Sequence, residues 1–485
     1  MQKSVKIYKF KAKFSPNSRS KGISLGEQKV FCMQKIDLKN QSVYKLYFRY
    51  FLPSLCAMLA LSTYNVVDGI FLGQKLGEDA LAAVGIAWPV FPVLIAYELL
   101  FSIGAASIAS YHLGRGEDEK AREVFSSVFY FALISGTAFG LLFYAFCDEI
   151  VVLLGASEKI APLSKQFLQI IFLGSFVIVL HPLLDVFAMN DKRPMLAMFA
   201  MIAGACSNVV LNYTFIFIFE WGLVGSGLAT ICGHGIGFLI LLSHFLRRKG
   251  QIYFVWAMKI KALLKSAQNG VAQASAELSA SLVMLVANHL LVSLGGDRAV
   301  AMYSVIMYSG IVLFTILLSA SQAIQPIVSF NFGARAYDRL LQMLKFALSF
   351  SLSAGIVLYA LSMAFSHYLV VLFLQKDGAG GFDSEFLRDV ESAMSVYFIA
   401  FIFIGFNMSV ASFFQSIQRP ISSFIVTIAY TLVFVLIFFM VLPEFYALDG
   451  IWASYPAAQF CSFFVAILVL CYAFKKGALK AEKWR

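Results

Sequence analysis

The sequence predicts an all-α integral membrane protein with twelve transmembrane helices. We expect two six-helix lobes, related by a pseudo-twofold axis along the membrane normal. Three observations predict this fold: the apolar composition, the placement of basic residues and an internal repeat. Hydrophobic residues make up 60% of the 485 residues and charged residues only 13%, whereas a soluble domain has about 25% charged residues. Lipid is therefore the expected solvent for most of the chain.

Apolar stretches of about 20 residues or more are long enough to cross a bilayer as helices. Twelve such stretches follow one another along the chain, separated by short polar segments. Their approximate bounds are residues 48–71, 82–112, 123–147, 163–188, 195–218, 222–246, 268–294, 299–330, 341–372, 391–416, 421–443 and 449–474.

The basic residues fix the expected orientation, because Lys and Arg accumulate in cytoplasmic segments. With both termini in the cytoplasm, only six of the 38 Lys and Arg residues fall outside: Lys75, Lys159, Lys165, Arg298, Lys376 and Arg388. The prediction is a multi-pass protein of the plasma membrane, the inner membrane of a bacterium. The net charge of +11 does not indicate nucleic acid, since the positive residues lie in short gaps where they attract anionic lipid headgroups.

Three short motifs occur twice, in the same order. An Arg-Pro pair follows the fourth and tenth spans, a Gly-rich turn precedes the sixth and twelfth, and another follows the second and eighth. The matched positions are 226, 228 and 219 residues apart: Pro194 with Pro420, Gly222 with Gly450, and Gly114 with Gly333. Each pair lies on one side of the membrane, which predicts a parallel repeat of six plus six spans. Rocking of two such bundles gives alternating access.

This repeat sets the expected domains. They are a basic tail over residues 1–45, a first lobe over 46–246, a connector over 247–266, a second lobe over 267–474 and a tail over 475–485. The chain starts either at Met1 or at Met33, which begins an ordinary cytoplasmic leader. Residues 1–32 are accordingly either an extension or a disordered basic tail.

Asp68 stands alone in the first apolar span, where an ionised carboxylate is costly unless it faces a wet cavity or binds a cation. Asn208 and Asn212 are four residues apart on the fifth span, so they share a helix face. Thr230 lies on the sixth span and Tyr64 one turn before Asp68. Carboxylate, amide and hydroxyl oxygens suit sodium, but a protonated Asp68 could bond the same neighbours. Alternatively, the asparagines only join helices.

Glu98 on the second span and Glu277 on the seventh are candidate sites for organic cations, which protonation would release. Asp185 lies near the inner end of the fourth span, one turn from His181, and is expected to be a locally paired acid. Gln322 and Gln325 on the eighth span and Tyr64 on the first are further candidates for substrate or proton binding.

Neither a Walker loop nor an HExxH or CxxC metal motif is present, so an ion gradient is the expected energy source. No cofactor is expected beyond the coupling ion, Na⁺ or H⁺. The seven cysteines are interpreted as small core residues rather than a disulfide framework. No obligate protein partner is evident, and a monomer is expected.

Several of these motifs together resemble the multidrug and toxic compound extrusion (MATE) family of secondary transporters. The resemblance covers roughly residues 45–475 and is carried by Pro53, Tyr64 to Asp68, Ala80 to Gly85, Leu113 to Gly116, Arg193-Pro194, Asn208 with Asn212, Trp221 to Gly225, Gln325-Pro326 and Arg419-Pro420. It implies two lobes that export cationic, amphipathic compounds in exchange for sodium or protons.

Residue by residue, Asp68 resembles the family's coupling carboxylate, and Asn208, Asn212 and Thr230 its cation-cage partners. Glu277 resembles the acid of the second lobe. Some members carry Asp where this chain has Asn212, and some carry a carboxylate inside the tenth span, where this chain has only Glu391 at the outer edge.

Three alternatives remain open. A flippase for lipid-linked sugars shares this general fold, but its anionic substrate would favour buried Arg or Lys, and none lies deep in a span. An integral-membrane enzyme could use His181 and Asp185 as an acid–base pair, although the repeat does not favour an enzyme. A metabolite exporter is hardly separable by sequence from a drug exporter.

Overall fold

The computed structural model describes residues 36–371 and 384–476. The choice between Met1 and Met33 lies outside the described residues. Within them the regular elements are all helical. The described residues belong to a single compact unit, so the domain boundaries at the connector stay a prediction.

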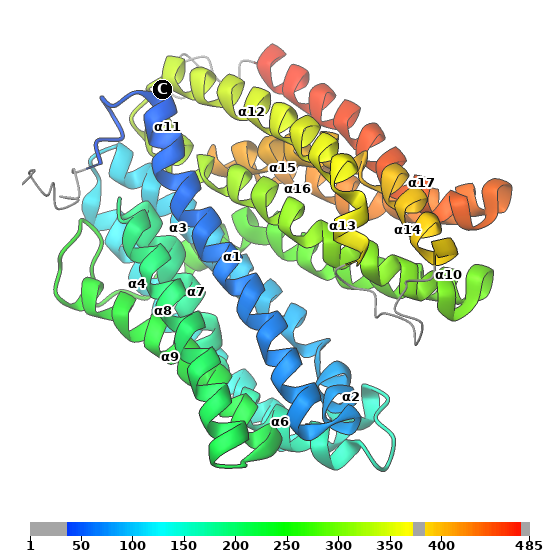
Figure 1. Ribbon diagram of the computed structural model, residues 1–485. Helices are drawn as coiled ribbons and strands as arrows, with labels where there is room; N and C mark the ends of the chain where they lie inside the picture. The colour runs from blue at the N-terminus through cyan, green and yellow to red at the C-terminus, as the bar shows by residue number, and fades with distance from the viewer. Residues whose placement is uncertain (1–35, 372–383, 477–485) are drawn as a thin grey trace, which may run out of the picture. The chain divides into compact units, whose positions relative to one another are not determined.

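The first lobe comprises the helices before the connector. They are α1 (Val43–Leu76), α2 (Glu78–Ala87), α3 (Val90–Gly114), α4 (Asp118–Ala145), α5 (Cys147–Leu153), α6 (Ala161–Leu173), α7 (Ser175–Asn190), α8 (Pro194–Tyr213), the π-helix η1 (Thr214–Ile218) and α9 (Gly222–Leu246). In Figure 1, α1 runs as one long blue helix from the end of the molecule near α11 to α2.

The second lobe comprises the helices after the connector. They are α10 (Ile260–Gln322), α11 (Ile324–Gly333), α12 (Tyr337–Ala364), α13 (Ser366–Val371), α14 (Ser384–Tyr397), α15 (Ala400–Ser416), α16 (Pro420–Ile428), the π-helix η2 (Ala429–Val433) and α17 (Phe434–Lys475). The element α10 bends at Gly296, where φ is 59°, and so contributes to two crossings.

Twelve membrane crossings follow from the lengths of the apolar helices in the described part of the chain. Ten helical segments there are long and apolar enough to cross, and α6 with α7 forms an eleventh as a pair bent by 51°. One of the ten, Pro420–Lys475, has 56 residues. At 1.5 Å per residue it would span about 84 Å, far more than the roughly 30 Å of a hydrocarbon core. It turns at Ala447, where φ is 49°, and therefore crosses twice.

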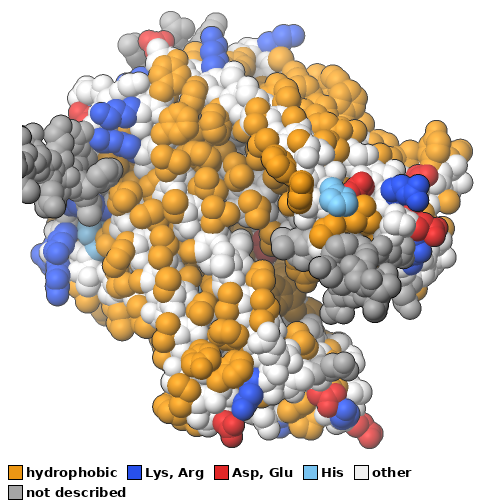
Figure 2. All heavy atoms as spheres, in the orientation of Figure 1, with side chains coloured by type: hydrophobic (Ala, Val, Ile, Leu, Met, Phe, Trp, Pro, Cys, Tyr) orange, Lys and Arg blue, Asp and Glu red, His pale blue; other side chains and the backbone are white. Residues whose placement is uncertain are grey.

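The surface agrees with a membrane setting. Figure 2 shows hydrophobic side chains filling the middle of one face, while Lys, Arg, Asp and Glu gather at its rim. One end of the helices holds the turns at residues 115–117, 191–193, 247–259, 334–336 and 417–419, in which Lys and Arg are frequent. We call this end the basic side and the other end the opposite side.

The two lobes meet at the basic side through matching glycines. A Cβ atom on Gly114 of α3 would lie 2.0 Å from the carbonyl oxygen of Phe330 on α11, and one on Gly333 would lie 1.9 Å from that of Tyr111. Only glycine permits such close backbone contact. Tyr111 and Phe330 are separated by the same 219 residues as Gly114 and Gly333, so the two contacts are related by the pseudo-twofold axis that the repeat predicts.

Hydroxyl contacts follow the same symmetry one turn away. Ser110 Oγ donates to the carbonyl of Pro326 at 3.2 Å, and the Oγ atoms of Ser107 and Ser329 lie 3.2 Å apart. In the repeat, which is offset by 219 residues here, Ser107 corresponds to Pro326 and Ser110 to Ser329. The basic-side halves of α3 and α11 are therefore closely packed against each other.

A pair of buried amides also joins the lobes. Asn190 at the end of α7 donates through Nδ2 to Gln325 Oε1 at 3.0 Å, and Gln325 Nε2 donates to Asn190 Oδ1 at 3.3 Å. Both residues are buried. This reciprocal pair has to break if the lobes are to separate at the basic side.

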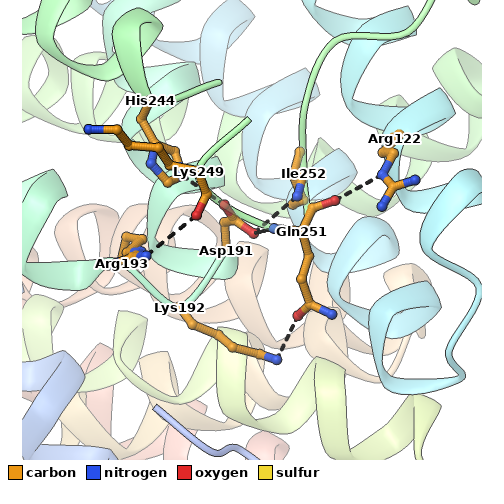
Figure 3. A network of polar contacts seen from close by, with 8 residues as sticks. All are labelled: Arg122, Asp191, Lys192, Arg193, His244, Lys249, Gln251 and Ile252. Atoms are coloured by element: carbon orange, nitrogen blue, oxygen red, sulfur yellow. Dashed lines mark hydrogen bonds and ion pairs between the residues drawn. The ribbon is translucent and has the colours of Figure 1, made fainter. Parts of the chain in front are cut away.

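The connector between the lobes is fastened by Asp191, as Figure 3 shows. Its carboxylate accepts hydrogen bonds from the backbone N–H groups of Gln251 at 2.7 Å and Ile252 at 3.1 Å, and it contacts His244 Nε2 at 2.7 Å. Arg122 Nε donates to the Gln251 carbonyl at 2.9 Å. The connector is therefore bound to the first lobe.

We expect Asp191→Ala to destabilise the protein by about 3 kcal/mol, because it leaves a buried and a half-buried backbone donor and the buried His244 without their acceptor. Thermal unfolding in detergent measures this as a lower melting temperature. Asp118→Ala is the matched control, since its half-buried carboxylate has only a 3.7 Å pair with Arg122, worth about 0.5 kcal/mol. Equal melting temperatures for the two variants would contradict this role.

Candidate functional site

Asp68 is a residue of α1 and lies where α1 meets α8 and α9 in the first lobe. Ser226 of α9 donates through Oγ to Asp68 Oδ1 at 3.3 Å, and Asn212 of α8 is a second side-chain partner of the carboxylate. The side chain is half-buried and has no ion pair with Lys, Arg or His in the described part of the chain. The charge of Asp68 is thus available for a mobile cation.

Glycines bring α8 and α9 together at this place. A Cβ atom on Gly233 would lie 2.9 Å from Asn208 Cβ, and one on Gly204 would lie 2.8 Å from the Gly233 carbonyl oxygen. The close packing turns the shared face of Asn208 and Asn212 toward α1 and α9. The sequence signal for this face, the four-residue spacing, is confirmed by a hydrogen bond from Asn212 Nδ2 to Asn208 Oδ1 at 3.2 Å.

The asparagine pair leaves polar atoms unsatisfied. Asn208 is 3% exposed and Asn212 is fully buried, yet Asn208 Nδ2 and Asn212 Oδ1 have no partner among the described residues. A buried polar atom without a partner costs about 1–3 kcal/mol. The bare oxygen of Asn212 belongs to a residue that also contacts the Asp68 carboxylate, and such a set of oxygens suits a small hard cation.

A small cavity lies one helical turn from Asp68. The centre of a water molecule can occupy about 10 Å³ of the cavity, so the cavity holds roughly one water molecule. Tyr64, Asn208 and Thr230 are among the residues that line it. The predicted ion-coupling residues therefore form two neighbouring groups. Asp68 and Asn212 belong to one, and Asn208 and Thr230 at the cavity belong to the other, together with Tyr64, a predicted substrate or proton residue.

Glu98 of α3 is the most deeply buried acid of the predicted set. It is 5% exposed, and its Oε1 atom has no partner. Asp185 of α7 and Glu277 of α10 both lie close enough to repel its charge. The structure thus brings together three acids, two from the first lobe and one from the second.

The expectation that Asp185 is locally paired is wrong. Its buried Oδ1 atom has no hydrogen-bond partner, and His181 contacts His234 instead. The charged groups that act on Glu98 are Asp185 and Glu277, and none of these three acids has an ion pair with Lys, Arg or His within the described residues. Such a region attracts cations and repels anions.

The two glutamines are placed differently from each other. Gln325 is engaged with Asn190 at the contact between the lobes, away from the cavity, whereas Gln322 is half-buried at the break between α10 and α11. Substrate binding by either residue stays a prediction.

Sequence reasoning missed two members of the site. Ser226 could have been found, because it lies one turn before Thr230 on the same face of α9. His234 lines the cavity together with His181. These histidines are 53 residues apart, and no local spacing indicates such a pair.

Comparisons with known proteins agree on one family. The sequence profile of the MatE family matches residues 53–214 and 274–441. Multidrug export protein MepA of Staphylococcus haemolyticus (strain JCSC1435) is 24% identical over 439 residues, which cover 89% of this chain and 94% of the relative.

Solved structures show the same fold. An outward-facing multidrug resistance MATE family transporter of the MOP superfamily has a TM-score of 0.85 at 22% identity, covering 92% of this chain and 99% of that one. A MOP superfamily transporter from Pyrococcus furiosus, described as having a binding pocket of reverse polarity, has a TM-score of 0.84 at 23% identity with the same coverage. Because the MatE profile matches more than half of its residues, the chain belongs to the MatE family and is a membrane transporter rather than an enzyme.

Proposed function

We propose that this protein exports cationic, amphipathic compounds in exchange for sodium ions or protons by alternating access. The basic side faces the cytoplasm, as the distribution of Lys and Arg indicates. The protein resides in the plasma membrane of a bacterium, and its relatives named multidrug export protein MepA are bacterial.

The observation that carries this proposal is the setting of Asp68. It is an intramembrane carboxylate without a basic partner in the described residues, with a hydroxyl donor in Ser226 and an asparagine pair beside it. A permanent structural charge would be paired. A sodium ion would be coordinated by the Asp68 carboxylate, by Asn212 Oδ1 and by neighbouring oxygens. A proton would instead neutralise the same carboxylate.

The substrate class follows from the second group of acids. Glu98 and Asp185 come from the first lobe and Glu277 from the second. The charged groups that act on Glu98 are the other two acids, and no basic group is among them. A positively charged, partly apolar molecule fits this charge and the surrounding hydrophobic residues. When the lobes rock, the acids from the two lobes separate, which weakens binding and releases the substrate.

The basic-side contacts describe one state of the cycle. With Gly114, Gly333 and the Asn190–Gln325 pair in contact, the cytoplasmic end is closed. Cation loading from outside and substrate release to the outside belong to this state. The inward-open state requires these contacts to break.

The test is transport by purified protein in liposomes loaded with ethidium. A sodium gradient and a proton gradient are imposed one at a time, with protein-free liposomes as the control. We expect one of the two gradients to drive ethidium out and its reversal to stop this. Ethidium movement equal to that of protein-free liposomes under both gradients would contradict the proposal.

A further inference from the structure

Two histidines face each other inside the first lobe. The Nδ1 atoms of His181 on α7 and His234 on α9 lie 3.1 Å apart. His181 is 2% exposed, and its Nε2 atom has no hydrogen-bond partner in the part of the chain that the structure describes. It fits against α9 only because residue 237 is glycine, where a Cβ atom would lie 2.2 Å from His181 Nε2. A packing role alone does not explain a polar side chain kept in this position.

The pair borders the same small cavity as Tyr64, Asn208 and Thr230. Of the other helices that line the cavity, α1 contributes one ionisable group, Tyr64, and α8 contributes none. No described residue of the neighbouring helices α4 and α6 lines the cavity. Along α7 the next ionisable group is Asp185, one turn from His181, with Glu98 of α3 beyond it. Lys and Arg are missing from the cavity lining.

The position of the cavity relative to Asp68 follows from the helix directions. Because α1 runs away from the basic side, Tyr64 lies nearer to that side than Asp68 does. Because α9 runs toward the basic side, Thr230 and His234 lie nearer to it than Ser226 does. The cavity and the histidine pair therefore lie on the basic side of Asp68. Asp185 follows one further turn along α7 toward the same side.

The geometry of the pair fixes how many protons it can hold. Each neutral imidazole carries one N–H group, so an Nδ1–Nδ1 contact uses a single proton, donated by one ring to the other. A further proton binds to the bare Nε2 of the donor ring, which becomes an imidazolium and strengthens the bond. A second added proton would place two N–H groups against each other and break the contact.

We propose that His181 and His234 together form a one-proton binding site, separate from Asp68. This inference rests on the proposed function and deepens it, since it adds a proton to the exchange whichever cation Asp68 binds. The added positive charge lies one turn from Asp185 and repels a cationic substrate held by the acids there. Proton binding by the pair and substrate binding by the acids are consequently antagonistic, and by linkage each expels the other.

The test counts protons released when ethidium binds to purified protein in weakly buffered detergent. A pH dye reports the release at several values between about pH 4 and pH 7, a window that extends below the range in which exposed histidines titrate. The variants are His181→Asn, His234→Asn and both together. His289→Gln is the matched control, because His289 is exposed on α10.

We expect each single histidine variant to release about one proton fewer per bound ethidium than the wild type. The double variant should also lose one rather than two, while His289→Gln and the wild type agree. Unchanged release in both single variants, or a loss of two in the double variant, would overturn the inference. If the histidine variants do not fold, NMR of histidine-labelled wild-type protein decides: loss of one imidazolium proton from the pair on ethidium binding supports the inference, and unchanged imidazole signals overturn it.

These outcomes are distinct from failure of the proposed function. Liposomes that export ethidium under a gradient, combined with unchanged proton release in the histidine variants, would leave the transporter intact and remove only the histidine site. Absence of gradient-driven export in the wild type would remove the proposed function.

Discussion

Asp68→Asn is expected to abolish cation-driven ethidium or norfloxacin efflux while leaving the protein in the membrane. The variant side chain has the same shape and can still accept the hydrogen bond from Ser226 Oγ, so folding is preserved. It carries no charge and takes up no proton, so the coupling cation loses its binding energy. Efflux should fall by about tenfold or more, the effect of losing at least about 1.4 kcal/mol of coupling free energy.

Efflux from cells and gradient-driven efflux from liposomes both measure this effect. Asp79→Asn is the matched control: it makes the same chemical change in the first lobe, but Asp79 is 47% exposed in a 2.7 Å pair with Lys159. The amount of each variant in the membrane is determined by immunoblotting. Undiminished efflux by Asp68→Asn would remove the coupling role of this residue.

Gly114→Ala should prevent full closure of the lobes at the basic side. The new Cβ atom would lie 2.0 Å from the Phe330 carbonyl oxygen, well inside van der Waals contact, and a backbone atom cannot move away as a side chain does. The closed state is destabilised, so the population shifts toward separated lobes. Transport should decrease strongly, because the cycle needs both states.

Spin labels at Lys120 and Lys345, exposed positions of the first and second lobes, report this shift in a variant without the seven native cysteines. The distance between the labels should increase in Gly114→Ala. Gly85→Ala is the matched control, since a Cβ atom at that helical position meets nothing within 4 Å. An unchanged distance together with normal transport would contradict the proposed closure.

Much of the fold could be predicted from the sequence, because a bilayer allows few solutions. Backbone polar groups in lipid have to be satisfied within helices, so apolar length and basic loops define the crossings. The repeat was visible through residues with special backbone demands. Gly116 and Arg335 both have positive φ, and so do Lys192 and Gln418 before the two Arg-Pro pairs, so these positions are equivalent in the structure as well.

The candidate site could be predicted only where one helix supplies the signal. Asn208 and Asn212 are an example, since a spacing of four places them on one face. Contacts between helices depend on tilts, bends and the glycines that set their approach. The neighbours of Asp185 and the contact between His181 and His234 arise in this way, as does the engagement of Gln325 with Asn190. None of them follows from residue spacing.

The central claim is that a cation bound at Asp68 changes which side of the transporter is open. The most direct measurement is the distance between labels at Lys159 and Arg388, exposed residues of the two lobes on the opposite side, with and without the driving cation. We predict that the cation shifts the distance distribution in the wild type and leaves it unchanged in Asp68→Asn. The same shift in both proteins, or no shift in the wild type, would contradict the claim.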